Sequence, residues 1–171
     1  MAAQDTSVKK QNRDCTEEED LFILLLSNLY HLKYDLLEFL PFMISKVSNQ
    51  ALKLIVLDTS SYIDSQVLRF NMIFKMLDEK CEARNSCVTG NLDLRTYFYC
   101  LTDESSAFKS DYALLTKLFL LESTTVTTLV LIKELAKRIR NKSIYSLIQE
   151  SLRAAIHRKG ELGKVVSTLI N

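Results

Sequence analysis

Residues 21–43, LFILLLSNLYHLKYDLLEFLPFM, decide the fold that the sequence predicts. Apolar side chains recur here every three or four residues, which is the spacing of one face of a helix. The recurring positions are Phe22, Leu25, Leu26, Leu29, Leu32, Leu36, Leu40 and Met43. Thr16 and Glu19 have the spacing of a capping box, so we expect the helix to begin at Thr16. Pro41 comes late in the helix, where it should kink the backbone or leave one carbonyl unpaired.

The rest of the chain predicts three more long helices and a short one. With 3 glycines and 1 proline, the chain has few of the residues that the turns of an all-β fold require. Helical spacing predicts a second helix over about 50–80, a third long helix over 111–140 and a last helix from 143. Residues 92–101 predict a short extra helix between the second and third long helices, although part of this segment also suits a strand. The expected fold is an all-α, up-down four-helix bundle.

Length and charge narrow the class of protein further. A chain of 171 residues can bury one sizeable core, and we expect the bundle to span 16–171 after a polar, disordered tail over 1–15. The formal net charge of +1 gives no field that attracts nucleic acid or an anionic membrane. The N-terminus lacks the apolar segment of a secretory signal, and no apolar run approaches the length of a membrane span. We expect a cytoplasmic protein that binds neither nucleic acid nor membranes.

Cysteine and histidine do not form a recognisable metal motif in this sequence. No Cys-x-x-Cys pair occurs, so the cysteines are expected to be free thiols. They are Cys15, Cys81, Cys87 and Cys100. His31 and His157 have no His or Glu at ligand spacing on the same helix, and we expect both to be solvated or capping residues.

A family resemblance rests mainly on the first predicted helix. Its motif residues stand at unbroken spacing, and they are Leu21, Phe22, Leu26, Tyr30, Leu36, Leu40, Pro41 and Met43. The second helix adds Gln66, Val67, Arg69 and Phe74. These residues resemble the Yci-type (YciE and YciF) ferritin-like family of bacterial stress proteins, a domain family of unknown function. The resemblance implies a ferritin-like bundle and a homodimer, to which apolar residues such as Tyr97, Phe98 and Tyr99 could contribute contact surface.

The chain departs from that family at the positions that resemble its di-metal ligands. On our alignment these positions are Lys33, Thr59, Ser61, Tyr62, Glu122, Ser123, Thr124, Thr125, Ala155 and Lys159. Glu122 is the only retained candidate ligand among them. One carboxylate does not hold two hard metal ions, and lysines repel them. The resemblance therefore implies that the metal site is lost and that no cofactor is bound.

Two lysines and one glutamate suggest what replaces the metal. Lys33 and Lys159 each lie seven residues from apolar neighbours on both sides, and Glu122 lies in the apolar run LFLLESTTVTTLVLI. Our hypothesis is an internal ion pair in which one or both lysines bind Glu122, because an isolated buried carboxylate is very unfavourable. We expect hydroxyl groups to complete the hydrogen bonding, namely those of Thr124, Thr125, Ser61 and Ser65. In the alternative, both lysines extend to solvent and Glu122 is neutral or bonded to threonines alone.

Two classes of function remain open. The first is a non-enzymatic bundle that has lost its di-metal site and acts as a structural or partner-binding protein, with a link to stress. The second is a metal-binding, iron-handling oxidoreductase with an altered carboxylate site. Its candidate ligands are Glu122, Asp64, Glu150 and Asp35. We favour the first, since four inward carboxylates and histidines would be needed for the second. No motif for nucleophilic catalysis or phosphate binding is present, so no catalytic residue is predicted.

Overall fold

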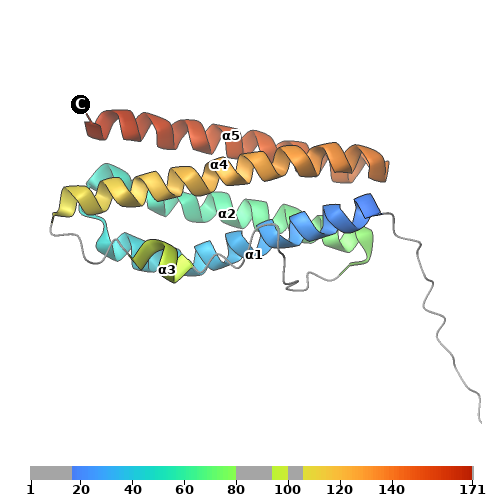
Figure 1. Ribbon diagram of the computed structural model, residues 1–171, viewed down its shortest axis with the longest axis horizontal. Helices are drawn as coiled ribbons and strands as arrows, with labels where there is room; N and C mark the ends of the chain where they lie inside the picture. The colour runs from blue at the N-terminus through green and yellow to red at the C-terminus, as the bar shows by residue number, and fades with distance from the viewer. Residues whose placement is uncertain (1–16, 80–93, 100–105, 171) are drawn as a thin grey trace, which may run out of the picture.

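The computed structural model describes residues 17–79, 94–99 and 106–170, and these residues form helices and no strand (Figure 1). The helices are α1 (Glu17–Lys46), α2 (Gln50–Leu77), α3 (Leu94–Tyr99), α4 (Ala107–Ile139) and α5 (Lys142–Ile170). The prediction of an all-α fold with a short helix between the second and third long helices is confirmed. The predicted tail over 1–15 and all four cysteines lie outside the described residues.

The four long helices form a bundle in which neighbouring helices run in opposite directions (Figure 1). Helix α1 packs on α2 and α4, and helix α5 packs on the same two helices from the other side. Helix α3 lies against α1. Helices α2 and α4 therefore occupy opposite corners of the bundle, and each keeps one face turned away from the core.

The turn between α1 and α2 is held by side chains from two parts of the chain. Asn49 is the N-cap of α2 and accepts a hydrogen bond from the Leu52 backbone N–H at 3.0 Å. The buried carboxylate of Asp111 accepts from the backbone N–H groups of Ser48 and Asn49, at 3.0 and 2.6 Å. We had expected the third long helix to begin at Asp111. Instead α4 begins one turn earlier, at Ala107.

The apolar core consists of two clusters, one toward each end of the bundle. The first gathers around Phe22, Leu29, Phe70, Leu129 and Ile148. The second gathers around Leu40, Val56, Phe98, Leu118 and Leu162. In each long helix, buried polar residues lie at or near the break between the clusters. We call this set the polar belt, and its members are Lys33, Thr59, Gln66, Glu122, Thr125, Thr128, Ser151 and Arg158.

Some apolar residues lie elsewhere than the sequence suggested. Leu54 and Leu57 belong to the apolar pattern of the second predicted helix, but both are exposed on the outer side of α2. Conversely, Phe98 was expected to extend a surface for a second subunit. Its side chain is fully buried and stacks on Phe39, with ring centroids 5.4 Å apart. Phe98 therefore cannot contribute to the expected contact surface, because α3 turns this ring into the core.

Helix α4 is the one described helix that is long and apolar enough to cross a membrane by length and composition. We had expected no segment of that kind. Serines and threonines, which are only weakly polar, join the two leucine-rich ends of α4 into one long stretch. Of its most apolar window, 44% is buried against the other helices.

Candidate functional site

The polar belt contains an ion pair between Lys33 of α1 and Glu122 of α4. The Lys33 Nζ lies 2.8 Å from Glu122 Oε2, and the two residues are 1% and 5% exposed. Each residue continues the inward stripe of its own helix, so the antiparallel packing of α1 on α4 brings the two charges together. Each group supplies the counter-charge that the other needs in an apolar interior.

Tyr62 of α2 completes this arrangement, which we call the ion cluster. Its hydroxyl donates a hydrogen bond to Glu122 Oε1, and its ring centroid lies 5.2 Å from the Lys33 Nζ. Burial raises the pKa of the Tyr62 hydroxyl well above its ordinary value, and the negative charge of Glu122 raises this pKa further. Tyr62 is therefore a neutral donor at physiological pH, and each carboxylate oxygen of Glu122 has a partner.

The hydroxyl groups that we expected around Glu122 are engaged elsewhere. Thr124 and Thr125 donate to the carbonyls of Leu120 and Leu121 in their own helix, at 3.1 and 3.0 Å. Ser65 likewise donates to the carbonyl of Ser61, on the exposed side of α2. Short hydroxyl side chains in a helix reach the carbonyl four residues earlier. The longer Tyr62 side chain spans the interior instead, and its only signal in the sequence was its alignment with a family ligand position.

Lys159 does not join the ion cluster. It is half-buried, and its Nζ lies 5.5 Å from the ring centroid of Phe119. The preceding residue, Arg158, is the inward cation of α5 and is 4% exposed. The prediction for Lys159 is therefore wrong by one position. Helix α5 turns the stripe that contains Ser151, Ala155 and Arg158 toward the core, and Lys159 lies at its edge.

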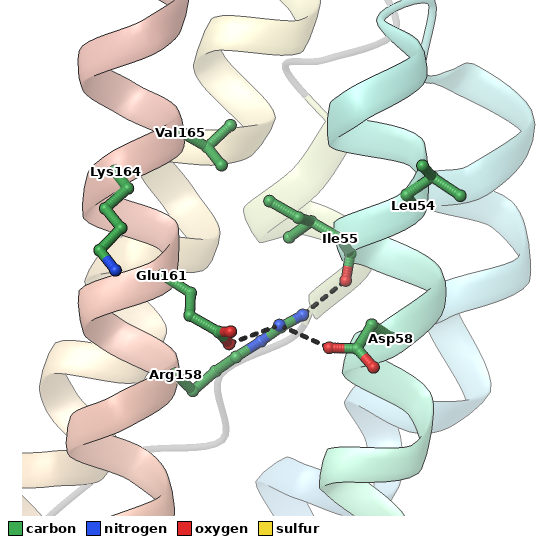
Figure 2. Close-up of a pocket in the computed structure, with 7 residues that line it drawn as sticks. All are labelled: Leu54, Ile55, Asp58, Arg158, Glu161, Lys164 and Val165. Atoms are coloured by element: carbon green, nitrogen blue, oxygen red, sulfur yellow. Dashed lines mark hydrogen bonds and ion pairs between the residues drawn. The ribbon is translucent and has the colours of Figure 1, made fainter.

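Arg158 forms a second arrangement, which joins α5 to α2 and which we call the arginine clasp (Figure 2). Its Nη1 lies 3.0 Å from Asp58 Oδ2 and 3.2 Å from Glu161 Oε2. Its Nη2 donates to the Ile55 carbonyl and to the Thr59 hydroxyl. The side chain of Asp58 is 70% exposed, so the clasp extends from the buried guanidinium to the surface.

Gln66 and Ser151 link α2 and α5 on the other side of the ion cluster. Gln66 Nε2 donates to the Ser151 carbonyl at 3.3 Å, and Arg69 Nε donates to the Ser151 hydroxyl at 3.0 Å. Two buried polar atoms, Gln66 Oε1 and Arg158 Nε, have no hydrogen-bond partner among the described residues. Both carboxylate oxygens of Glu122 therefore have partners, whereas one buried atom of Gln66 and one of Arg158 have none among the described residues.

The family is settled by comparison with known proteins. The profile of a family described as a domain of unknown function (DUF892) matches residues 17–171. The chain is a member of this family. Its fold is similar to that of the Escherichia coli stress protein YciF, with a TM-score of 0.80 and 20% sequence identity over 90% of this chain and 97% of YciF. It is also similar to YcfI, a candidate structural protein from Rhodopseudomonas palustris, with a TM-score of 0.78 and 18% identity over 89% and 96% of the two chains.

No curated protein matches the chain. Membership of DUF892 and the likeness to YciF confirm the Yci-type resemblance and the ferritin-like helical bundle predicted from the first helix. At 18–20% identity, the two solved structures show the fold alone.

In this member of DUF892, the donor set of the belt does not fit a pair of metal ions. Asp35, Asp64 and Glu150 were the other candidate ligands, and all three are exposed. Within the described part of the chain, no group of three or more His, Cys, Asp or Glu residues could hold a metal ion. Glu122 is the only carboxylate of the belt, and the ammonium of Lys33 lies against it. A hard divalent cation requires several oxygen ligands and no cation at this distance.

A shallow cavity of about 380 Å³ lies beside the arginine clasp, between α2 and α5 (Figure 2). Its lining residues are Leu54, Ile55, Asp58, Arg158, Glu161, Lys164 and Val165. Its two cations are matched by two carboxylates, so the cavity has no net charge to attract an ion. Its apolar residues, Leu54, Ile55 and Val165, fit an apolar side chain better.

Proposed function

We propose that this chain is a non-enzymatic, ferritin-like bundle protein that acts through its structure or by binding a protein partner. In this proposal the ion cluster takes the place of a di-metal site. The observation that carries it is the pairing of Glu122, whose two oxygens bind Lys33 and Tyr62. A metal ion entering here would have to displace both partners and would lie beside an ammonium group.

The electrostatics of the belt support the same proposal. Within the polar belt, Lys33 and Arg158 place two cationic side chains in the interior beside a single carboxylate, that of Glu122. A di-iron carboxylate bundle requires the opposite balance, with acidic residues and histidines facing inward from all four helices. The charge that metal ions would supply is thus already supplied by side chains.

A role connected with stress is part of the proposal, and it comes from the relatives alone. YciF is named as a stress protein and YcfI as a candidate structural protein. We propose that this chain serves as a structural component in such a response. The proposal that this chain is not an enzyme does not depend on a role in stress.

The test is elemental analysis by plasma mass spectrometry on untagged protein purified without chelator. The protein is measured as purified and again after incubation with Fe²⁺, Mn²⁺ or Zn²⁺. We expect less than about 0.1 equivalent of metal per chain and no rise in melting temperature, since a ligand that binds only the folded state must stabilise it. Binding of about one or two equivalents with a rise in melting temperature would show that the proposal is wrong.

A matched variant keeps this test sensitive. Lys33→Glu places a carboxylate where the ammonium now lies, and two buried carboxylates without a cation repel each other. We expect this variant to melt at a lower temperature than wild type and to recover part of the loss when a divalent cation is added. If a divalent cation raises the melting temperature of Lys33→Glu but not that of wild type, Lys33 is the group that prevents metal binding.

A further inference from the structure

The cavity beside the arginine clasp brings three kinds of chemical group together between α2 and α5 (Figure 2). Its volume of about 380 Å³ lies near the lower end of the range for small-molecule sites, about 300–1,000 Å³. Two carboxylates, one exposed lysine and three aliphatic side chains line it together with Arg158. The size of the cavity and this mixture of groups suit a small molecule with charged and apolar parts.

Asp58 and Glu161 form the negative part of the cavity. Asp58 Oδ2 and Glu161 Oε2 lie 3.0 and 3.2 Å from the same nitrogen, Arg158 Nη1, so two negative charges share one positive charge. His157 Nδ1 approaches the same oxygen of Glu161, at 3.7 Å. The second oxygens, Asp58 Oδ1 and Glu161 Oε1, have no hydrogen-bond partner in the described part of the chain. A primary ammonium group has three N–H donors and can bind both carboxylates.

Arg158 holds these carboxylates in place but has no donor left for a bound molecule. Its two terminal nitrogens carry four N–H donors, and all four are directed to the acceptors of the arginine clasp. The remaining donor, on Nε, is buried and cannot reach a molecule in the cavity. Arg158 is therefore a positioning residue for Asp58 and Glu161.

Lys164 is the cation that can bind a negative group in the cavity. It follows Glu161 by three residues on α5, and side chains at this spacing are neighbours on a helix surface. Its side chain is exposed, and its ammonium group has no ion-pair or hydrogen-bond partner among the residues described. A positive charge thus lies beside the two carboxylates. This order of charges complements an α-amino acid, in which the ammonium and carboxylate groups are adjacent.

Three aliphatic side chains form the apolar wall of the cavity, namely Leu54 and Ile55 of α2 and Val165 of α5. Leu54 is 58% exposed, and the other two are partly buried (Figure 2). An apolar side chain placed against this wall would remove apolar surface from water on both sides, which is favourable.

We propose that this cavity binds a free α-amino acid with an apolar side chain. Its ammonium group binds Asp58 and Glu161, its carboxylate binds Lys164, and its side chain packs on Leu54, Ile55 and Val165. Such a zwitterion has no net charge, as the cavity has none. Because the charged groups are exposed to solvent, we expect weak binding, with a Kd of about 1 mM. This inference is independent of the proposed function and of the loss of the metal site.

The experiment compares the melting temperature of the full chain with and without L-leucine at about 10 mM. A ligand at about ten times its Kd should raise the melting temperature by about 3–6 °C. Three analogues each lack one recognised group: glycine lacks the side chain, isocaproate lacks the ammonium group and L-leucinamide lacks the carboxylate. Each analogue should raise the melting temperature less than L-leucine does.

Variants assign the two charged contacts, with each Kd measured by titration followed by nuclear magnetic resonance. Glu161→Gln and Lys164→Met should each weaken the binding of L-leucine about threefold to tenfold, the effect of one exposed ion pair. Lys164→Met should also bind L-leucine and L-leucinamide equally, since the contact to the carboxylate is gone. Lys142→Met is the matched control. It removes an exposed lysine at the other end of α5 and should bind like wild type.

Each variant is compared with its own melting temperature in the absence of ligand, so a change in stability alone does not affect the result. No rise in the melting temperature of wild type with L-leucine would overturn the proposal. So would an equal rise with isocaproate, because the ammonium group would then have no role. Equal binding of L-leucinamide and L-leucine by wild type would also overturn it and would indicate that the cavity recognises the N-terminal residue of a polypeptide.

Discussion

Among the described residues two cations, Lys33 and Arg158, are buried, and their surroundings differ. Lys33 pairs with Glu122 in the ion cluster, where both partners are almost completely buried. Arg158 is equally buried, but its carboxylate partners Asp58 and Glu161 are in contact with solvent. The comparison shows that burial of a charge does not by itself decide what its loss costs. The cost depends on whether the remaining partner can return to water.

The largest effect is expected from Lys33→Met, which leaves the Glu122 carboxylate buried without a cation. We expect the free energy of unfolding at pH 7 to fall by about 3–5 kcal/mol, measured by urea denaturation. The matched Arg158→Met variant should lose less, because Asp58 and Glu161 become solvated when the guanidinium is removed. Equal losses in the two variants would abolish the distinction between the ion cluster and the clasp.

Tyr62→Phe removes one hydrogen bond to Glu122 and keeps the ring beside Lys33. A hydrogen bond to a charged group contributes about 1.5–3 kcal/mol, and we expect a loss of that size near pH 7. Because the pKa of Tyr62 is raised in the folded state, its contribution is complete below the unfolded pKa of about 10 and is lost as the pH rises above it. Urea denaturation of both proteins at pH 8 and pH 11 should show the gap narrowing. A gap that stays constant would contradict the buried position of this hydroxyl.

The double variant Lys33→Met/Glu122→Met tests whether the ion pair stabilises the fold or only avoids a penalty. Replacing both charges with apolar side chains of similar length avoids a lone buried charge but leaves the Tyr62 hydroxyl without its acceptor, so we expect a loss of about 1–3 kcal/mol relative to wild type. Its unfolding free energy is compared with those of both single variants in a double-mutant cycle. A double variant less stable than Lys33→Met would mean that the belt needs charge at this position.

The smallest effect is expected from Asp58→Asn, at the solvent end of the clasp. Ion pairs with an exposed partner contribute about 0–1 kcal/mol, and salt screens them further. The loss in unfolding free energy should stay within this range and shrink when salt is added. A loss as large as that of Lys33→Met would show that Asp58 is part of the buried electrostatics, contrary to its exposure.

The sequence predicted the bundle and offered the pairing of Lys33 with Glu122 as one of two alternatives, and the structure has this pair at 2.8 Å. Both residues lie in long apolar stripes whose inward direction is unambiguous, and a buried carboxylate requires a cation. The same reasoning proposed Lys159 as a second partner of Glu122, but the buried cation of α5 is its neighbour Arg158. Adjacent residues on a helix point about 100° apart, and each lies on a seven-residue repeat with apolar members. Only the packing of α5 on α2 decides between them.

Contacts between distant segments explain the remaining errors. Asp111 binds the turn before α2, 62 and 63 residues earlier in the chain, and this role could not be read from the helical pattern around it. Leu54 and Leu57 lie on a helix with apolar residues on two sides, and the hydrophobic pattern does not say which side faces the core. Tyr62 could be found only by its alignment with a family ligand position, because a tyrosine is common in many settings.

The division of the core by the polar belt has a consequence for how the chain finds its native alignment. Long helices lined with leucine can slide past one another by a full turn and still bury similar apolar area. Such a slip would move Glu122 away from Lys33 and into one of the leucine clusters, and would separate Arg158 from the Thr59 hydroxyl. The polar belt thus favours one register of the four helices along the bundle axis, whereas apolar packing alone would allow several.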